Sequence, residues 1–320
     1  MKWAADMKKN ANKEKLLVIL GPTASGKTGL SIDIARALET EIISGDSMLF
    51  YRGFDIGSAK SSTAEQSGIR HHMIDILPPE ASYNVTEFLQ EVQALITDLN
   101  EQGKLPVLVG GTGLYIQSLL EGYAFNQQSE DKEYRAYLER LAEEKGKEYV
   151  HGMLEKADPE AARRLHVNDF RRVIRALEVH HLGGEKISQE KSKELVYDAY
   201  VMGLNWPRPK LYQRINMRVD IMVQQGLAAE IEGLLRAGVP QEAQAMKGIG
   251  YKEILAAING QMTMEQAIDK VKQNSRHFAK RQVTWYRRMP YIHWYQPDLY
   301  QRDGLLANAL WDIKGYFGIK

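Results

Sequence analysis

The sequence contains no cysteine. This absence excludes a disulfide framework, zinc sites built on cysteine and thiol catalysis, and it fits the reducing environment of the cytoplasm. No apolar run approaches the roughly 18 residues that a membrane helix requires. The opening MKWAADMKKNANKEK carries charges throughout and has no apolar segment, so it lacks the pattern of a secretory signal. We therefore predict a cytoplasmic protein without a membrane anchor, in which residues 1–13 form a mobile tail.

Acidic residues are missing from one segment near the C-terminal end. Between Lys270 and Arg288 there are seven Lys or Arg residues and no Asp or Glu, although the net charge of the chain is only +1. Such a local excess is typical of a surface that binds a polyanion, although it could also be only a solvated face. On a helical wheel the basic side chains form two neighbouring stripes, the first within an arc of roughly 80°: Lys272, Arg276, Lys280 and Arg287, then Lys270, Arg281 and Arg288. The opposite side, which we expect to face the core, carries Val271, Phe278 and Trp285.

Short apolar runs alternate with helical patterns in the first part of the chain. The runs at 15–21, 41–46 and 105–111 predict strands, and 71–77 predicts a weaker one. Asn84 and Glu87 form a capping pair before a helix that extends to about Gln102. This alternation predicts parallel βαβ units and a doubly wound sheet, whose ligands lie at the carboxyl ends of the strands. Three candidate site elements follow predicted strands: the loop 21–28, Asp46, and the turn Gly110-Gly111-Thr112.

The middle of the chain has a different pattern. From about residue 126 to 193 it is charged and helical without a convincing strand, whereas 199–206 and 291–295 again predict strands. We predict an α/β fold with a P-loop-type doubly wound parallel sheet, a helical insertion domain and a helical C-terminal region. The core would comprise residues 14–122 and 197–320, and the insertion domain residues 123–196. We expect a monomer.

GPTASGKT has the pattern G-x-x-x-x-G-K-[ST] between a predicted strand and a predicted helix. In this pattern backbone N–H groups and the helix N-terminus face phosphate oxygens, the lysine adds a full charge, and the final hydroxyl can bind magnesium. The sequence therefore predicts a phosphate site with a magnesium ligand at Thr28. Its members are Gly21, Pro22, Thr23, Ala24, Ser25, Gly26, Lys27 and Thr28.

One part of a nucleotide-hydrolysing site is missing. Such enzymes hold magnesium with an Asp at the end of a second apolar strand, but LPVLVGGTG ends in glycines and threonine. Asp46 ends a well-defined strand, and Asp75 lies in a weaker one. Asp46 is therefore either the magnesium ligand of a small-molecule kinase or a base for an incoming nucleophile. Composition and spacing leave both alternatives open.

Seven segments resemble, in order and from about Leu16 to Trp294, the tRNA dimethylallyltransferase family, the bacterial tRNA isopentenyltransferases. They are GPTASGKT (21–28), ISGDSMLFYRGFDIGSAK (43–60), HHMIDI (71–76), LVGGTGLYI (108–116), RRVIRALEV (171–179), GIGYKE (248–253) and KRQVTWYRR (280–288). The family transfers a dimethylallyl group from its diphosphate to the exocyclic amine of the adenine just 3′ of the anticodon. The resemblance implies that the P-loop binds the diphosphate of the isoprenoid donor.

The resemblance also implies individual roles. Asp46 would accept the proton of the adenine amine, and Thr112 would lie at the reaction centre. Arg218, one helical turn from Arg214, would bind the diphosphate together with the P-loop and magnesium. The predicted partner is the anticodon stem-loop of tRNA. Its predicted contacts are Asp46, Ser47, Met48, Leu49, Thr112, Arg171, Arg172, Arg175, Lys247, Tyr251, Arg276, Lys280, Arg281, Gln282, Trp285 and Arg287.

Two features depart from the family pattern. Leu49 stands where many relatives have Gln, which removes one possible hydrogen bond to a base. The absence of cysteine excludes the C-terminal zinc finger of eukaryotic relatives. Two other classes remain: a P-loop small-molecule kinase, which explains neither the basic segment nor the insertion, and an RNA-binding protein with a vestigial P-loop, which would not need Asp46.

Overall fold

The structure is a computed structural model that describes residues 13–123, 131–183 and 194–319. The chain divides into two compact units, one formed by Met1–Leu120 with Leu195–Lys320 and the other by Glu121–Glu194. The predicted insertion, 123–196, begins and ends two residues later than this second unit. The predicted tail lies outside the described residues except for Lys13.

The first unit contains a six-stranded sheet in the order β3-β2-β4-β1-β5-β6, and every pair of neighbours is parallel. The central β1 is flanked by β4 and β5, so the strand order reverses there and the predicted doubly wound sheet is confirmed. Carboxyl ends of strands at such a reversal border a crevice where ligands bind. The strands are β1 Lys15–Leu20, β2 Ile42–Ser44, β3 His71–His72, β4 Val107–Gly110, β5 Asp198–Leu204 and β6 Ile292–Tyr295.

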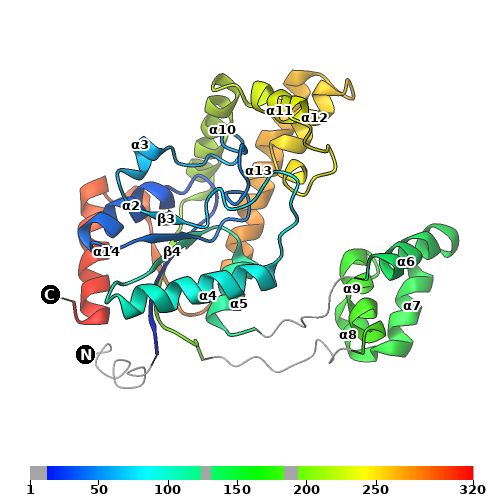
Figure 1. Cartoon of the computed structure of the whole chain (residues 1–320), viewed down its shortest axis with the longest axis horizontal. Helices are drawn as coiled ribbons and strands as arrows, with labels where there is room; N and C mark the ends of the chain where they lie inside the picture. The colour runs from blue at the N-terminus through cyan, green and yellow to red at the C-terminus, as the bar shows by residue number, and fades with distance from the viewer. Residues whose placement is uncertain (1–12, 124–130, 184–193, 320) are drawn as a thin grey trace. The chain divides into compact units, whose positions relative to one another are not determined.

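Helices cover both faces of this sheet. Side chains alternate along β1, so that Leu17 and Ile19 pack with α2 and α14, while Leu16 and Val18 are buried on the other face. In Figure 1, α4 lies along the face opposite α2. The helices of this unit are α2 Lys27–Ala37, α3 Thr63–Gln66, α4 Val85–Glu101, α5 Gly113–Leu120, α10 Arg208–Gln224, α11 Leu227–Arg236, α12 Tyr251–Ile258, α13 Met264–Tyr286 and α14 Arg302–Phe317.

The second unit is helical in its described residues and has its own core. Leu138, Leu154, Val173 and Leu177 are buried together between its helices. Glu178 is also fully buried, and it forms ion pairs with Arg135 and Arg175. The helices are α6 Lys132–Lys145, α7 Lys147–Ala157, α8 Pro159–Arg164 and α9 Phe170–His181.

Local signals decide where the elements begin and end. The capping box of Asn84 and Glu87 at the start of α4 is present as predicted. The predicted strand 71–77 is wrong beyond His72, because Met73 and Asp75 adopt left-handed backbone with φ of 62° and 55°. Left-handed residues cannot continue a β ladder. Only an isolated bridge, between Tyr51 and Leu77, follows.

The helical wheel of α13 is correct at Val271 and wrong at Phe278, which is 36% exposed. In the middle of the helix Ala279 packs against Leu211 and Ile215 of α10. This contact turns the buried face away from Phe278, whose ring instead lies beneath the guanidinium of Arg281. Among the described residues, no helix combines the length and apolar character needed to cross a bilayer.

Candidate active site

The P-loop follows β1 and turns into α2. Ala24 and Gly26 have φ of 62° and 91°, and the Ser25 N–H donates to the Pro22 carbonyl at 3.2 Å. No side chain caps α2 at Gly26. The first amides of an uncapped helix can therefore bind an anion, aided by the positive end of the helix dipole.

Lys27 and Asp46 lie beside the same glycine, Gly111. A Cβ atom at Gly111 would lie 3.7 Å from Lys27 Nζ and 3.8 Å from Asp46 Oδ2. The pKa of Lys27 is lowered to about 8, chiefly by burial, which outweighs the opposing effect of Asp46 and is reinforced by nearby Arg218. The ammonium group is therefore poorly compensated in the free protein and would be stabilised by an anion in the P-loop.

Asp46 and Thr112 are brought together by two neighbouring turns. The Gly45 N–H donates to the Val109 carbonyl at 2.7 Å, and the Ser47 N–H donates to Thr112 Oγ1 at 3.4 Å. Asp46 Oδ1 accepts from the Met48 N–H at 3.1 Å, which orients the carboxylate. The two residues predicted to share a reaction centre thus lie on adjacent turns.

Gln282 of α13 links these turns to the P-loop. Its Oε1 accepts from the Thr23 N–H at 3.0 Å, and its Nε2 donates to the Gly111 carbonyl at 2.8 Å. Tyr286 donates to the same carbonyl at 2.8 Å, and burial raises its pKa, so the phenol stays protonated. Gln282 is only 5% exposed. The sequence predicts an RNA contact at Gln282. Its burial, with both ends of the amide engaged, is a feature that only the folded chain reveals.

Two arginines of α10 reach the P-loop from the same side of their helix, as their spacing predicts. Arg214 Nε donates to the Ala24 carbonyl at 2.8 Å, and its guanidinium lies 4.4 Å from the ring centroid of Trp206. Arg218 donates to Thr23 Oγ1 at 3.5 Å and to the Ser58 carbonyl at 3.3 Å. Both cations therefore border the P-loop, where the sequence predicts a phosphate site.

A cavity of about 1040 Å³ opens beside the P-loop. Its wall comes from the P-loop, from the segment 55–62 and from α10, and includes Lys27, Thr28, Ile56, Lys60, Arg214 and Arg218. Asp46 and Thr112 lie outside this lining. Lys27 lines the cavity and also borders Gly111. It is therefore the residue that connects the cavity with the Asp46 carboxylate.

Apart from the exposed Lys270, the basic side chains of α13 and of the residues just after it fall into two groups. Lys272 pairs with Asp220 at 2.6 Å and Arg276 donates to Asn216 at 2.7 Å, so both are engaged with α10. Further along, the side chains are exposed: Lys280, Arg281, Arg287 and Arg288. Of the predicted RNA contacts on α13, the exposed basic side chains therefore lie on the last two turns of the helix and just after it.

The other predicted RNA contacts have varied surroundings. Lys247 is exposed, and Met48 lies against Gly248. Trp285 packs on Gly113, and Tyr251 is fully buried with its hydroxyl on Glu230, a packing that disfavours direct RNA contact. In the second unit, Arg171 and Arg172 are exposed, whereas Arg175 pairs with Glu178. These contacts stay predictions.

The fold and this site define a P-loop-type α/β protein in which a phosphate loop adjoins a carboxylate. The model of the IPP transferase family matches residues 49–289. The tRNA dimethylallyltransferases of Bacillus cereus (strain B4264) and Bacillus anthracis are each 51% identical over 88% of this chain, and the aligned region covers 90% and 91% of those proteins. The chain therefore belongs to the IPP transferase family and is a prenyltransferase.

Solved structures agree. The tRNA isopentenylpyrophosphate transferase of Bacillus halodurans is 42% identical, with a TM-score of 0.73 over 96% of this chain and 97% of that one. A eukaryotic dimethylallyltransferase acting on tRNA is 30% identical, with a TM-score of 0.80 over 95% of this chain and 79% of that one. The shared fold thus extends over nearly the whole chain.

Proposed function

We propose that this protein transfers a dimethylallyl group from dimethylallyl diphosphate to the exocyclic amine of the adenine 3′ of the anticodon in tRNA. The observation that carries the proposal is that Lys27 and Asp46 both lie within 4 Å of the same Cβ position at Gly111. A phosphate-binding cation and a carboxylate so arranged suit a substitution in which a diphosphate leaves and an amine enters. The names of the relatives support tRNA as the acceptor.

In the proposed reaction the allylic C–O bond breaks and a C–N bond to the adenine forms. Negative charge grows on the departing diphosphate, which the P-loop amides, Lys27 and Arg218 would stabilise. The adenine amine is a weak nucleophile because its lone pair is delocalised into the ring. Transfer of its proton to Asp46 as the new bond forms would remove the positive charge that otherwise develops on nitrogen.

Magnesium fits this site as a companion of the diphosphate. Thr28 is exposed at the start of α2 and lines the cavity. Across the described residues there is no group of three His, Cys, Asp or Glu suited to a metal ion. Magnesium often needs few protein ligands when phosphate oxygens supply the rest. When bound, it would neutralise charge on the leaving group.

The acceptor RNA would be held by positive charge. The target adenine must leave its stack to present its amine, and a loop offers unpaired bases that can be splayed out. The exposed basic residues at the end of α13 and Arg171 of the second unit would contact phosphates. Because one chain supplies every residue named here, we propose that a monomer acts on tRNA in the cytoplasm.

The decisive experiment uses labelled dimethylallyl diphosphate with three acceptors: tRNA, AMP and ATP. We expect label in tRNA alone, on the adenine 3′ of the anticodon, and no productive turnover of ATP. Label in free nucleotide would assign a different acceptor. Magnesium-dependent ATP turnover without prenyl transfer would support the kinase alternative.

A further inference from the structure

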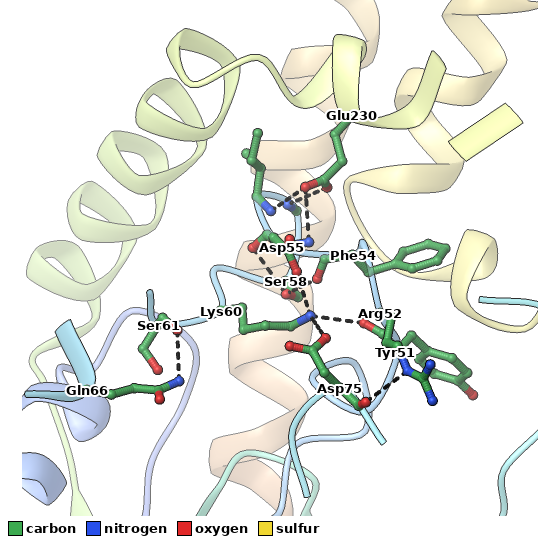
Figure 2. Close-up of polar contacts among 12 residues, drawn as sticks. Tyr51, Arg52, Phe54, Asp55, Ser58, Lys60, Ser61, Gln66, Asp75 and Glu230 are labelled. Carbon is green, nitrogen blue, oxygen red and sulfur yellow. Dashed lines mark hydrogen bonds and ion pairs between the residues drawn. The ribbon is translucent and has the colours of Figure 1, made fainter. Parts of the chain in front are cut away.

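One carboxylate holds part of the wall of the cavity beside the P-loop, although it does not line the cavity itself. Glu230, in the first turn of α11, accepts from three successive backbone N–H groups: Asp55 at 3.0 Å, Ile56 at 2.6 Å and Gly57 at 3.2 Å. Figure 2 shows this carboxylate above the segment that carries Asp55 and Ser58. Three successive amides turned toward one anion form a nest, and here the protein's own carboxylate fills it.

The packing around the nest is close. The Tyr251 hydroxyl donates to Glu230 at 2.8 Å, and its ring leaves no room for a Cβ at Gly57, which would approach ring atoms to 2.5 Å. The Phe54 ring lies 4.8 Å from that of Tyr251. The Glu230 carboxylate and the Tyr251 ring therefore hold the segment from one side.

Lys60 fixes the other end of the segment. Its ammonium, on a side chain only 6% exposed, donates to the Tyr51 carbonyl and pairs with Asp55 and Asp75 (Figure 2). Between the two anchors Ala59 has a φ of 50°, a left-handed conformation that is unfavourable for a residue with a Cβ atom. Such a conformation persists only where the surroundings enforce it.

The segment contacts Arg218, the arginine proposed to bind the diphosphate. The Ser58 carbonyl, next to the nest, accepts from Arg218 at 3.3 Å, and Ile56, Ala59 and Lys60 line the cavity. We propose that Glu230 is a positioning residue for donor binding: by holding the amides of residues 55–57 it places the Ser58 carbonyl, which orients Arg218 toward the diphosphate. This inference deepens the proposed function and rests on it.

The test measures binding of inorganic diphosphate by calorimetry, without RNA. Glu230→Gln keeps the size of the side chain but loses the charge and replaces one acceptor oxygen with a donor. We expect about tenfold weaker binding, the change that about 1.4 kcal/mol produces. Glu232→Gln is the matched control, because Glu232 lies on the same helix, is half exposed and pairs at 3.9 Å with Arg236. It should bind diphosphate like the wild type.

A double-mutant cycle separates positioning from general destabilisation. If Glu230 acts through Arg218, Glu230→Gln should weaken binding less than about twofold further in an Arg218→Ala background, since the two effects are then coupled. An equal loss in both backgrounds would overturn the inference. Should Glu230→Gln not fold, Glu230→Asp, which keeps the charge on a shorter side chain, is placed in the same cycle with the same criterion.

The outcomes also separate the two proposals. Wild-type protein that binds diphosphate, beside a Glu230→Gln variant that binds it equally well, overturns the inference alone. Wild-type protein that binds no diphosphate overturns the proposed function and the inference with it.

Discussion

Lys27 holds its proton less firmly than a lysine in water does. Burial lowers its pKa to about 8, so in the free enzyme the ammonium is lost as the pH rises through that value. The neutral amine cannot attract a diphosphate. We therefore expect kcat/KM for the donor, which reports the enzyme without bound donor, to fall above about pH 8.

A pH profile at saturating tRNA measures this fall. Lys27→Arg retains a cation that does not titrate in this range, so its kcat/KM is expected to be lower but free of the decline. A wild-type profile that stays flat through pH 9 would contradict the role assigned to the Lys27 charge.

Asp46 should matter to the rate far more than to RNA affinity. Asp46→Asn keeps an oxygen for the Met48 N–H but cannot take a proton. General-base catalysis contributes typically about 100- to 10,000-fold, so single-turnover prenylation should slow by that order. Filter binding of tRNA should change little, because the proposed phosphate contacts would still hold the RNA. An unchanged rate would remove Asp46 from the base role.

The amide of Gln282 connects helix α13 to the P-loop and to the Gly111 turn. Gln282→Glu can still accept from the Thr23 N–H but places an oxygen against the Gly111 carbonyl in place of a donor. An unsatisfied buried group costs about 1–3 kcal/mol. We expect a slower transfer at saturating substrates, measured beside Gln273→Glu on an exposed position of the same helix. Equal rates for the two variants would contradict this assignment.

The end of α13 should set the salt dependence of RNA binding. Removing one phosphate-binding cation flattens the slope of log K against log salt by about one. We expect this for Lys280→Ala and Arg287→Ala, with different tRNAs weakened alike and donor affinity unchanged. Lys272→Ala is the internal control, since Lys272 already pairs with Asp220. If Lys280→Ala and Arg287→Ala both keep the parental slope, this face is only exposed to solvent and does not bind the RNA.

Local sequence signals predicted the elements and the three strand-end loops, because hydrophobic period, caps and a phosphate-loop pattern act over a few residues. The predicted strand 71–77 is wrong where two non-glycine residues adopt a left-handed backbone, which composition does not predict. Local signals could not predict the structural roles of Gln282 and Glu230. Their partners lie 259 and 173 to 175 residues away in the chain, at Thr23 and at the 55–57 segment, so their roles exist only after folding.

The second unit has a hydrophobic core and a buried, ion-paired carboxylate of its own. Burial raises the pKa of the Glu178 carboxyl, but hydrogen bonds from Arg135 and Arg175 outweigh it, so the net pKa is lowered. The stabilisation is therefore present above the pKa of the unfolded carboxyl and is lost as the pH falls through the lower folded value. Breaking a buried ion pair costs about 3–5 kcal/mol, an upper figure here because both arginines are partly exposed.

Glu178→Gln should consequently unfold the second unit at lower temperature and leave the first unit unchanged. Calorimetry should resolve two transitions of which only one moves, and diphosphate binding should persist. Glu139→Gln, on an exposed position of α6, is the control. A single transition that shifts as a whole would show that the two units unfold together.

The division of the sheet between two distant segments has a consequence during synthesis. β1 can pair with β4 once residue 110 has emerged, but its other edge waits for β5, which begins at Asp198. At about 5–20 residues per second, that edge stays open for several seconds, while the helical unit, with its own core, can fold. Gln282 arrives later still and joins the P-loop to the Gly111 turn. A ribosome-bound chain that ends before α13 should therefore hold a nearly complete sheet in which the P-loop and the Gly111 turn are not yet joined.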